Sequence, residues 1–254
     1  MKAQPHAATR RIGLLVPSSN TTVEPEFYRA LPPHISLHVA RLNLTRITPD
    51  AILGMVADLD AQSRNLATAD VDVIVLGATA PSFLKGLGYD REIAQRIEAG
   101  TGKRATTTST ALIEAMRHLK LQRVVLGSAY DEKVNGIARG FLEANGATVL
   151  DAQGLGLVDN LVVGRLEEGS AYELARRIDQ PEAEGIVLAC TNWRTMGVIE
   201  RLEQDLHKPV ISTTQVSIWA ALRMLGEVQG IAGYGRLLRE VAMPPREPQA
   251  AVKL

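Results

Sequence analysis

The sequence predicts an α/β fold made of two pseudo-symmetric, doubly wound halves, each with a parallel sheet, and a cleft between them. Two observations carry this prediction: short apolar runs alternate with longer amphipathic segments, and the chain partly repeats itself. Short runs rich in β-branched residues fit strands buried on both faces, as in a parallel sheet covered by helices. With 254 residues, the chain can form one large domain of this type or two small ones.

The strands and helices are predicted from periodicity and from capping signals. Buried strands are predicted at residues 12–16, 73–76, 124–126 and 186–188. A fifth stretch, residues 35–39, alternates apolar and polar side chains like a strand. The clearest helix start is Thr48-Pro49-Asp50, where a capping residue precedes a proline and an acidic residue. Further helices are predicted over residues 90–100, 110–119, 132–145, 168–179, 195–206 and 215–226.

The internal repeat relates residues that are about 112 positions apart. V-I-V-L-G-A-T at 73–79 matches G-I-V-L-A-C-T at 185–191, which pairs Ala78 with Cys190. Thr106-Thr107-Thr108 matches Ser212-Thr213-Thr214 at an offset of 106, so one connection is expected to differ in length by six residues.

The repeat sets the predicted domain boundaries. Residues 11–110 form the first half and residues 123–216 form the second. Residues 217–240 are assigned to a segment able to pack back on the first half, and residues 241–254 to a C-terminal tail.

Composition argues against several classes of partner. Lysine plus arginine equals aspartate plus glutamate at 28 each, so the formal net charge is zero. Nucleic acid and anionic membrane surfaces both require clustered positive charge, so we expect neither as a partner. The single cysteine excludes an intramolecular disulfide, and no apolar stretch approaches the ~20 residues that span a bilayer. Because the chain opens without a signal-peptide pattern, we expect a cytoplasmic protein.

The loops that follow the predicted strands are small, hydroxylated or amide-bearing, and almost uncharged. They comprise residues 17–21, 78–80, 128–130 and 190–192. The carboxyl ends of parallel strands in two facing halves meet at a cleft, where ligands bind. Hydroxyls, amides and backbone N–H groups can hold a carboxylate, so the cleft is expected to take a small anionic ligand.

Four of these loop residues have two interpretations each. Cys190 precedes a predicted helix, where a thiol can have a lowered pKa, but it could equally be a buried structural cysteine. Tyr130 could donate to an oxyanion or could pack over the next helix. Asn20 and Asn192 could bind a ligand, although turn formation or helix capping explains an asparagine after a strand.

No motif predicts a cofactor or a metal ion. Gly154-Leu155-Gly156 lacks the third glycine of a dinucleotide fingerprint, and Gly102-Lys103 lacks most of a phosphate loop. His34 and His38 lie in a strand-like stretch and not in a zinc-binding helix. We therefore expect no cofactor and no metal site.

Six motifs carry a resemblance to a known family. They are V-P-S-S-N-T-T at 16–22, A-T-A-P-S-F at 78–83, T-T-T-S-T-A at 106–111, A-Y at 129–130, C-T-N at 190–192 and G-Y-G-R-L at 233–237. Through them the chain resembles the aspartate/glutamate racemase superfamily, in the branch of maleate isomerase and arylmalonate decarboxylase. The resemblance covers about residues 11–238. It implies two pseudo-symmetric halves with the site between them, and a homo-oligomer.

The number of thiols distinguishes the members of this branch. The resemblance implies that racemases and maleate isomerase use one cysteine from each half, whereas arylmalonate decarboxylase keeps only the second. In the decarboxylase, carbon dioxide is lost without a cofactor and the cysteine then protonates an enediolate. This chain has Ala78 where the first cysteine would stand and Cys190 at the second position.

The resemblance also implies roles for individual residues. Cys190 matches the proton donor, and Thr79 and Tyr130 match the hydroxyls that bind the oxyanion. The remaining candidates match substrate-binding positions: they are Ser18, Asn20, Ala80, Thr191 and Asn192. Among these, Ala80 stands where the decarboxylase has a serine, so only its backbone N–H can be carried over.

Three hypotheses for function follow. The first is a cofactor-independent decarboxylase like arylmalonate decarboxylase, which acts on a small carboxylate or dicarboxylate through an enediolate with a single catalytic cysteine. The second is an isomerase like maleate isomerase, or a racemase, in which Thr79, Tyr130 or water replaces the missing thiol. The third is a non-catalytic carboxylate-binding protein.

Overall fold

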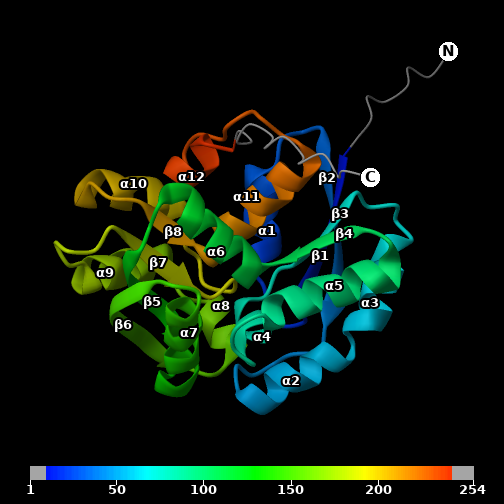
Figure 1. The fold of residues 1–254 in the computed structure, drawn as a ribbon, viewed down its shortest axis with the longest axis horizontal. Helices are drawn as coiled ribbons and strands as arrows, with labels where there is room; N and C mark the ends of the chain where they lie inside the picture. Colours follow the sequence, from blue (N-terminus) through cyan, green and yellow to red (C-terminus); the bar gives the residue numbers. More distant parts are fainter. Residues whose placement is uncertain (1–9, 242–254) are drawn as a thin grey trace, which may run out of the picture.

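Two parallel sheets of four strands organise the protein, of which the computed structural model describes residues 10–241. The strands of the first sheet are β1 (Arg10–Pro17), β2 (Ile35–Leu42), β3 (Val73–Leu76) and β4 (Arg104–Thr107). Those of the second are β5 (Arg123–Tyr130), β6 (Thr148–Leu157), β7 (Gly185–Ala189) and β8 (Val210–Ser212). The orders are β2-β1-β3-β4 and β6-β5-β7-β8, so both sheets have the same topology. The predicted fold class is confirmed (Figure 1).

Helices connect successive strands, as parallel pairing requires. In the first half they are α1 (Val23–Ala30), α2 (Pro49–Ala57), α3 (Leu59–Ala67), α4 (Thr79–Phe83), α5 (Tyr89–Thr101) and α6 (Thr108–Leu119). The following helices are α7 (Glu132–Ala144), α8 (Asn160–Gly164), α9 (Glu168–Ile178), α10 (Met196–Leu206), α11 (Thr213–Leu225) and α12 (Arg236–Arg239). The predicted start at Pro49 is confirmed, and each of the six predicted ranges overlaps one helix to within two residues at either end.

The central strands explain why the apolar runs were readable in the sequence. Every residue of β3 and of β7 is buried, because helices cover both faces of each sheet. The strands β4, β6 and β8 were not predicted. β4 (R-A-T-T) and β8 (V-I-S) are short, and β6 is a half-exposed edge strand, so none has a long apolar run.

The strand register defines the repeat more closely than the sequence did. Leu76 pairs with Thr107 in the first sheet, and Leu188 pairs with Ser212 in the second. Thr107 and Ser212 are therefore equivalent, and they are 105 residues apart instead of 106. The length difference in the connection is seven residues, not six, because the match of threonine-rich segments had slipped by one position.

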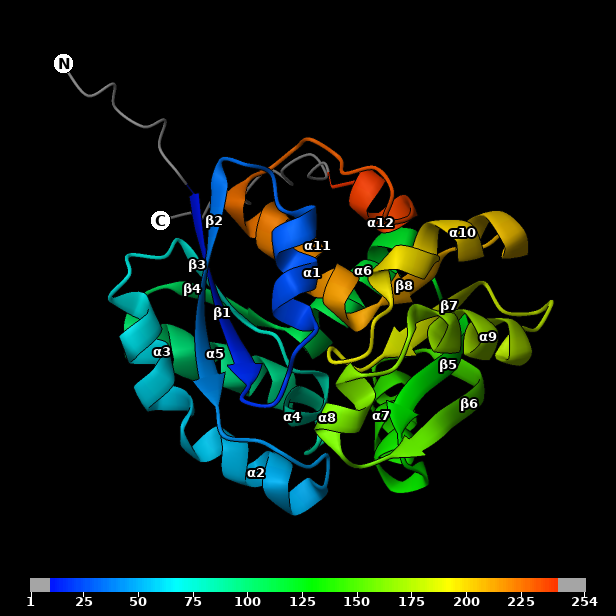
Figure 2. The same ribbon diagram turned by 180° about the vertical axis from the view of Figure 1, so that it is seen from behind.

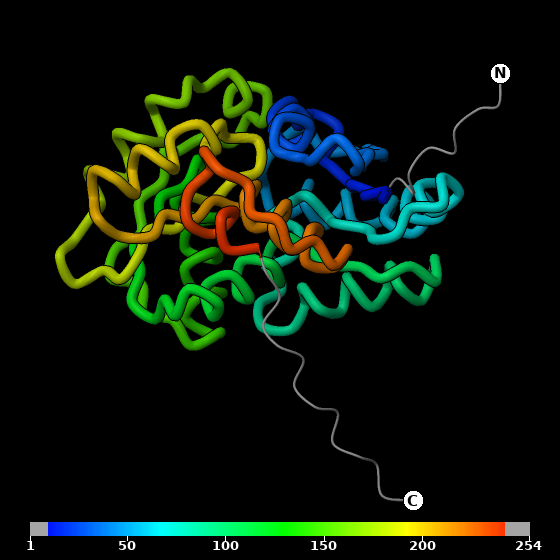
Figure 3. The backbone as a smooth tube through the Cα atoms, turned by 90° about the horizontal axis from the view of Figure 1, so that it is seen from above, coloured from blue at the N-terminus to red at the C-terminus, as the bar shows by residue number. Residues whose placement is uncertain are grey.

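The helix α11 joins the two halves. It leaves β8 in the second sheet and contacts α6, α1, β3 and β4, in addition to β7 and β8 (Figure 3). All but two of its thirteen residues are buried, including Trp219. In Figures 1 and 2, the short helices α4 and α8 also lie between the two sheets. The carboxyl ends of the strands in the two sheets therefore lie near helices that pack between the halves (Figures 1 and 2).

Some predictions fall outside the described residues. The predicted tail, residues 241–254, is described only at Val241, and the chain start is described from Arg10 onward. Among the helices of the described part, none is long and apolar enough to cross a membrane.

The first helix after β4 and the first helix after β8 have equivalent N-caps, whose contributions to stability can be compared. Thr107 accepts from Thr110 N at the start of α6, and Ser212 accepts from Gln215 N at the start of α11. Replacing either residue with alanine removes a capping bond, so each variant should lose about 1 kcal/mol of unfolding free energy. Urea titration measures this loss. Thr48→Ala is the matched control, because Thr48 caps α2 without a side-chain hydrogen bond, and an equal loss there would contradict the assignment.

Candidate active site

A small cavity of about 20 Å³ lies at the carboxyl ends of the strands, between the two halves. This is room for about one water molecule, well below the volume of about 300–1,000 Å³ that is usual for ligand pockets. It is lined by Pro17, Asn20, Leu44, Ile47, Ala78, Thr79, Ala80, Pro81, Tyr130, Asn160, Cys190, Thr191 and Asn192. None of these lining residues is charged, so a ligand in the cavity would be surrounded by neutral groups.

Seven of the eight predicted site residues line this cavity, and Ser18 does not. The Ser18 hydroxyl donates to Leu44 O at 3.2 Å and accepts from Leu44 N at 3.0 Å. Leu44 lines the cavity, and Ser18 supports it by binding its backbone. Ser18 therefore has a structural contact with a lining residue and does not line the cavity itself.

Cys190 occupies a strained backbone position at the end of β7. Its φ angle is +130°, a region that non-glycine residues rarely adopt. The position is held by a bond from Cys190 N to Thr213 Oγ1 of 3.1 Å and by one from Trp193 N to Cys190 O of 3.0 Å. The equivalent residue of the first half, Ala78, has an ordinary extended conformation with φ of −145°. Of these two equivalent positions, only that of the cysteine has a strained backbone.

The thiol of Cys190 is held protonated. Burial raises the pKa of Cys190 from 9.0 to about 11, although N–H groups of Asn192 and Trp193 and the hydroxyl of Tyr130 oppose this shift. A lowered pKa, expected from a nearby helix N-terminus, is not found. The helix α10 begins only at Met196, and the influence of a helix terminus is confined to about one turn.

Tyr130 and Thr79 place two hydroxyl groups beside the thiol. Burial raises the pKa of Tyr130 well above its usual value, and the adjacent Cys190 raises it further, so the phenol remains an O–H donor. The ring is fixed by an edge-on contact with Phe83, with centroids 6.2 Å apart. Thr79 Oγ1 is buried without a hydrogen-bond partner in the described chain. A buried hydroxyl without a partner is costly, and a ligand oxygen would satisfy it.

Asn20 combines the two interpretations that the sequence left open. Its Oδ1 accepts from Thr22 N at 2.9 Å and from Val23 N at 3.0 Å, which is a capping arrangement at the start of α1. Its Nδ2 points the other way and donates to Thr191 Oγ1 at 3.2 Å, across the boundary between the halves. An amide nitrogen carries two hydrogens, so one remains for a ligand.

Asn192 bridges the halves more directly. Its Oδ1 accepts from Thr21 N at 2.8 Å, and its Nδ2 donates to the backbone oxygen of Asn160. The Asn160 side chain in turn donates to Ser19 Oγ at 2.8 Å. This network requires close approach of α8, because a Cβ atom added at Gly164 would lie 3.1 Å from both amide atoms of Asn192.

Asn160, Leu44 and Ile47 are lining residues that sequence reasoning missed. Leu44 and Ile47 lie in the loop after β2, and Asn160 begins α8, directly after the loop that follows β6. These two loops are equivalent in the repeat and pair with each other, as in the bond from Ile47 N to Val158 O of 2.8 Å. Neither loop follows a strand with a strong apolar run, so no strand end marked them. Extending the repeat to these two loops would have been the available signal.

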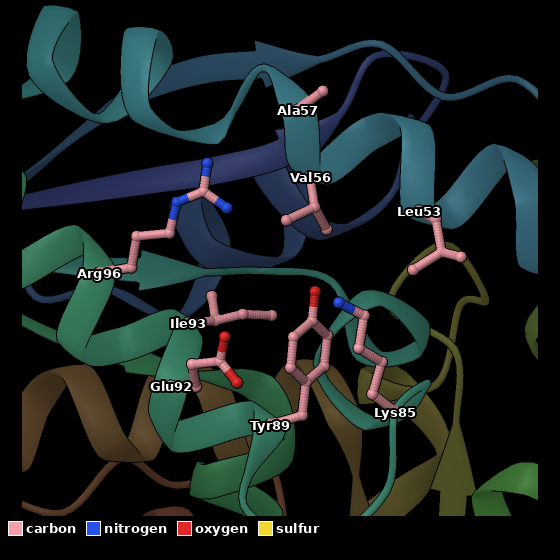
Figure 4. Close-up of a pocket in the computed structure, with 8 residues that line it drawn as sticks. All are labelled: Leu53, Val56, Ala57, Lys85, Tyr89, Glu92, Ile93 and Arg96. Carbon is pink, nitrogen blue, oxygen red and sulfur yellow. The ribbon is translucent and has the colours of Figure 1, made fainter.

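A second and larger hollow lies between α2 and α5, with a volume of about 320 Å³ (Figure 4). Lys85 lies over the ring of Tyr89 there, and Arg96 forms two bonds to Asp60 at 2.6 and 2.9 Å. Its cations are thus engaged within the protein, and it shares no lining residue with the cavity at Cys190. The cysteine cavity is therefore the candidate active site.

Residues 12–238 match a family model described as arylmalonate decarboxylase. The chain belongs to this family. A maleate isomerase from Nocardia farcinica is 31% identical over 91% of this chain and 96% of its own. An arylmalonate decarboxylase from Bordetella bronchiseptica is 28% identical over 92% of this chain and 98% of its own. The predicted resemblance is confirmed, and the relatives include both isomerases and a decarboxylase.

A solved structure shows the same fold in a relative, together with a covalent cysteine intermediate of that relative. It is a maleate cis-trans isomerase from Nocardia farcinica, in a variant with one cysteine replaced by serine and with a covalently bound succinylcysteine intermediate. It superimposes with a TM-score of 0.87 and 28% identity, over 91% of this chain and 98% of the other. Cysteine chemistry on a small dicarboxylate is therefore present in the family.

The raised pKa of Cys190 predicts slow alkylation of the folded protein. A shift from 9.0 to about 11 leaves about 100-fold less thiolate at pH 8 than in an ordinary cysteine. Reaction with iodoacetamide, followed by intact mass, should be slowed at least to that extent, and the rate should rise with pH up to about 11. The same protein unfolded in urea serves as control. A folded protein that reacts as fast as the unfolded one would contradict this assignment.

Proposed function

We propose that this protein is a cofactor-independent decarboxylase that removes carbon dioxide from a small malonate-type dicarboxylate and protonates the product at carbon. The observation that supports this proposal is a single thiol in the cavity. Cys190 lies in the second half, whereas the equivalent position of the first half holds Ala78, whose methyl group cannot transfer a proton. The resemblance associates one thiol of this kind with arylmalonate decarboxylase.

The protonation state of Cys190 suits a proton donor. When the carbon–carboxylate bond breaks, carbon dioxide leaves and the electron pair remains as an enediolate. The neutral thiol then gives its proton to the carbon, and the resulting thiolate recovers a proton from water. A pKa of about 11 keeps the donor loaded at neutral pH, whereas it would suppress nucleophilic attack, which requires thiolate.

Neutral donors would stabilise the enediolate. The hydroxyls of Tyr130 and Thr79 face the thiol side of the cavity, and α4 begins at Thr79, so the N–H of Ala80 lacks an intrahelical partner. The N–H of Thr191 is a further candidate on the opposite loop. Such donors are effective because the cavity is buried and their orientation is already set by the fold.

The substrate carboxylate that remains would be bound by the asparagines. Asn20 and Asn192 each have one amide hydrogen left after their contacts within the protein. The absence of a lysine or arginine among the lining residues limits the charge that the cavity can hold, which favours a small substrate that loses one carboxylate.

A second candidate is an isomerase that interconverts a cis and a trans dicarboxylate. It is favoured by the 31% identity to a maleate isomerase and by the presence of Asn20 and Asn192 in the cavity, where they would bind carboxylates. Incubation with phenylmalonate and with maleate in deuterated water separates the two candidates. Carbon dioxide release with deuterium at the product carbon supports the decarboxylase, whereas fumarate formation without gas supports the isomerase. Tight binding without turnover supports a non-catalytic carboxylate-binding protein.

Loss of the Cys190 thiol should abolish most turnover while sparing the fold. We expect Cys190→Ala to lower kcat by about 10²–10⁴-fold, the usual contribution of a general acid. Circular dichroism and the melting temperature should remain close to those of the native protein. A fully active Cys190→Ala variant would exclude the proposed proton transfer.

The Tyr130 hydroxyl should contribute as an oxyanion donor. Tyr130→Phe keeps the ring contact with Phe83 but removes the O–H group, so kcat should fall by about 10²-fold. The exposed Tyr28 offers the matched control, because Tyr28→Phe removes a phenol that lies outside the cavity. Steady-state kinetics of both variants decide the point, and equal effects would argue against a role for Tyr130.

We also propose that the protein acts in the cytoplasm, as a homo-oligomer and without a cofactor. A single cysteine, buried and reduced, fits a reducing compartment. The oligomer is suggested by the family resemblance alone.

A further inference from the structure

Glu26 is a buried carboxyl group that the proposed reaction does not use. It lies in the first turn of α1, just after the loop that carries Asn20, and it is only 3% exposed. Its Oε1 accepts from Thr195 N at 3.2 Å and from Met196 N at 3.3 Å, at the start of α10. Glu26 therefore ties the first half of the protein to the segment that follows Cys190 in the second half.

Three other hydrogen bonds join the same two segments. Thr21 N donates to Asn192 Oδ1 and Thr22 Oγ1 donates to Asn192 O, both at 2.8 Å, and Asn20 Nδ2 donates to Thr191 Oγ1. Hydrogen bonds thus join residues 20–22 to residues 191–192, and Glu26 to residues 195–196. If the hydrogen bonds of Glu26 to Thr195 and Met196 weaken, both the loop that carries Cys190 and the loop that carries Asn20 lose a support.

The second oxygen of the Glu26 carboxyl group lacks a partner. Within the described chain, Oε2 is buried without a hydrogen bond, and so are the nearby hydroxyls of Thr195 and Thr214. A neutral carboxylic acid suits this arrangement, because its carbonyl oxygen accepts the two N–H bonds and its O–H can donate to a threonine hydroxyl. A carboxylate here is a buried charge, which is costly without a cation.

The charged groups around Glu26 do not supply that cation. Glu167 and Glu168 from the start of α9, with Arg29 of α1 and Arg194 before α10, line the hollow outside it, but no ion pair with Glu26 forms in the described residues. Burial raises the pKa of Glu26 from 4.5 to about 7, and the charge of Glu168 adds to this, while the N–H bonds from Met196 and Thr195 and the proximity of the Thr214 hydroxyl oppose it. Glu26 therefore changes charge near neutral pH, where Cys190 and Tyr130 do not.

We propose that Glu26 is a positioning residue: in its uncharged form it holds the Cys190 loop against the Asn20 loop, and its ionisation loosens this contact. The catalytic consequence rests on the function proposed above. The structural consequence does not, because the alkylation rate of Cys190, the only cysteine in the chain, can be measured without a substrate.

The experiment compares Glu26→Gln, which imitates the neutral acid, with Glu26→Ala, which removes both hydrogen bonds to α10. Glu132→Gln is the control, since Glu132 is an exposed residue in the first turn of α7. Alkylation of Cys190 by iodoacetamide is followed by intact mass at about pH 6 and about pH 8.5, on either side of the expected ionisation. Melting temperatures are measured from about pH 4.5 to about pH 8.5, to cover the pKa of Glu26 in the unfolded chain and in the folded protein, and kcat is measured against pH with phenylmalonate.

At the higher pH, Cys190 should react about tenfold faster in the native protein than in Glu26→Gln, and at the lower pH the two should agree. Glu26→Ala should react faster than native at both pH values, and Glu132→Gln should match the native protein. The pKa of Glu26 is higher in the folded protein than in the unfolded chain. The stability that neutral Glu26 contributes is therefore complete below about pH 4.5 and is lost as pH rises to about 7. The melting temperature of the native protein should therefore fall relative to Glu26→Gln over that window.

Turnover gives the third readout. In the native protein kcat should fall as pH rises through about 7, and Glu26→Gln should lack this fall. Equal alkylation of native protein and Glu26→Gln at both pH values would overturn the proposal, even if Glu26→Ala fails to fold. The expected alkylation pattern without any turnover would uphold the positioning role and contradict the proposed function alone.

Discussion

The hydrogen bonds of the Asn192 side chain hold together the two halves that enclose the cavity. The amide oxygen binds the backbone of the first half at Thr21, and the amide nitrogen binds the backbone of Asn160 in the second. The bond to Asn160 is buried and the bond from Thr21 is partly buried, and a hydrogen bond in such a place is stronger than in water and costly to leave unmade. Because the cavity wall comes from loops of both halves, its shape depends on these contacts.

The two halves share a topology but not a chemistry. Equivalent strand ends carry Ala78 and Cys190, and only Cys190 has a strained backbone, held by Thr213. Strain of this kind persists only where the surrounding structure enforces it, and it often marks a functional residue. The two symmetric halves thus place one thiol on one side of the cavity. A proton from this thiol can reach only one face of a bound substrate.

Burial also determines what the polar groups of the cavity can do. It raises the pKa of Cys190 and that of Tyr130, so both remain neutral donors at physiological pH. The same environment strengthens the interaction of such donors with a developing negative charge. A neutral, hydroxyl-rich cavity is therefore suited to stabilising an enediolate and poorly suited to generating a thiolate nucleophile.

The amino-acid sequence by itself determined the fold class, the main helices, the central strands and seven of the residues that line the cavity. These were readable because buried strands have apolar runs and because polar loops follow them. Tertiary structure decided the rest: the position of Ser18 behind the wall, the contribution of Asn160, and the raised pKa of Cys190. These properties depend on the packing of loops from different halves, and distances between distant segments are not encoded in local patterns of residues.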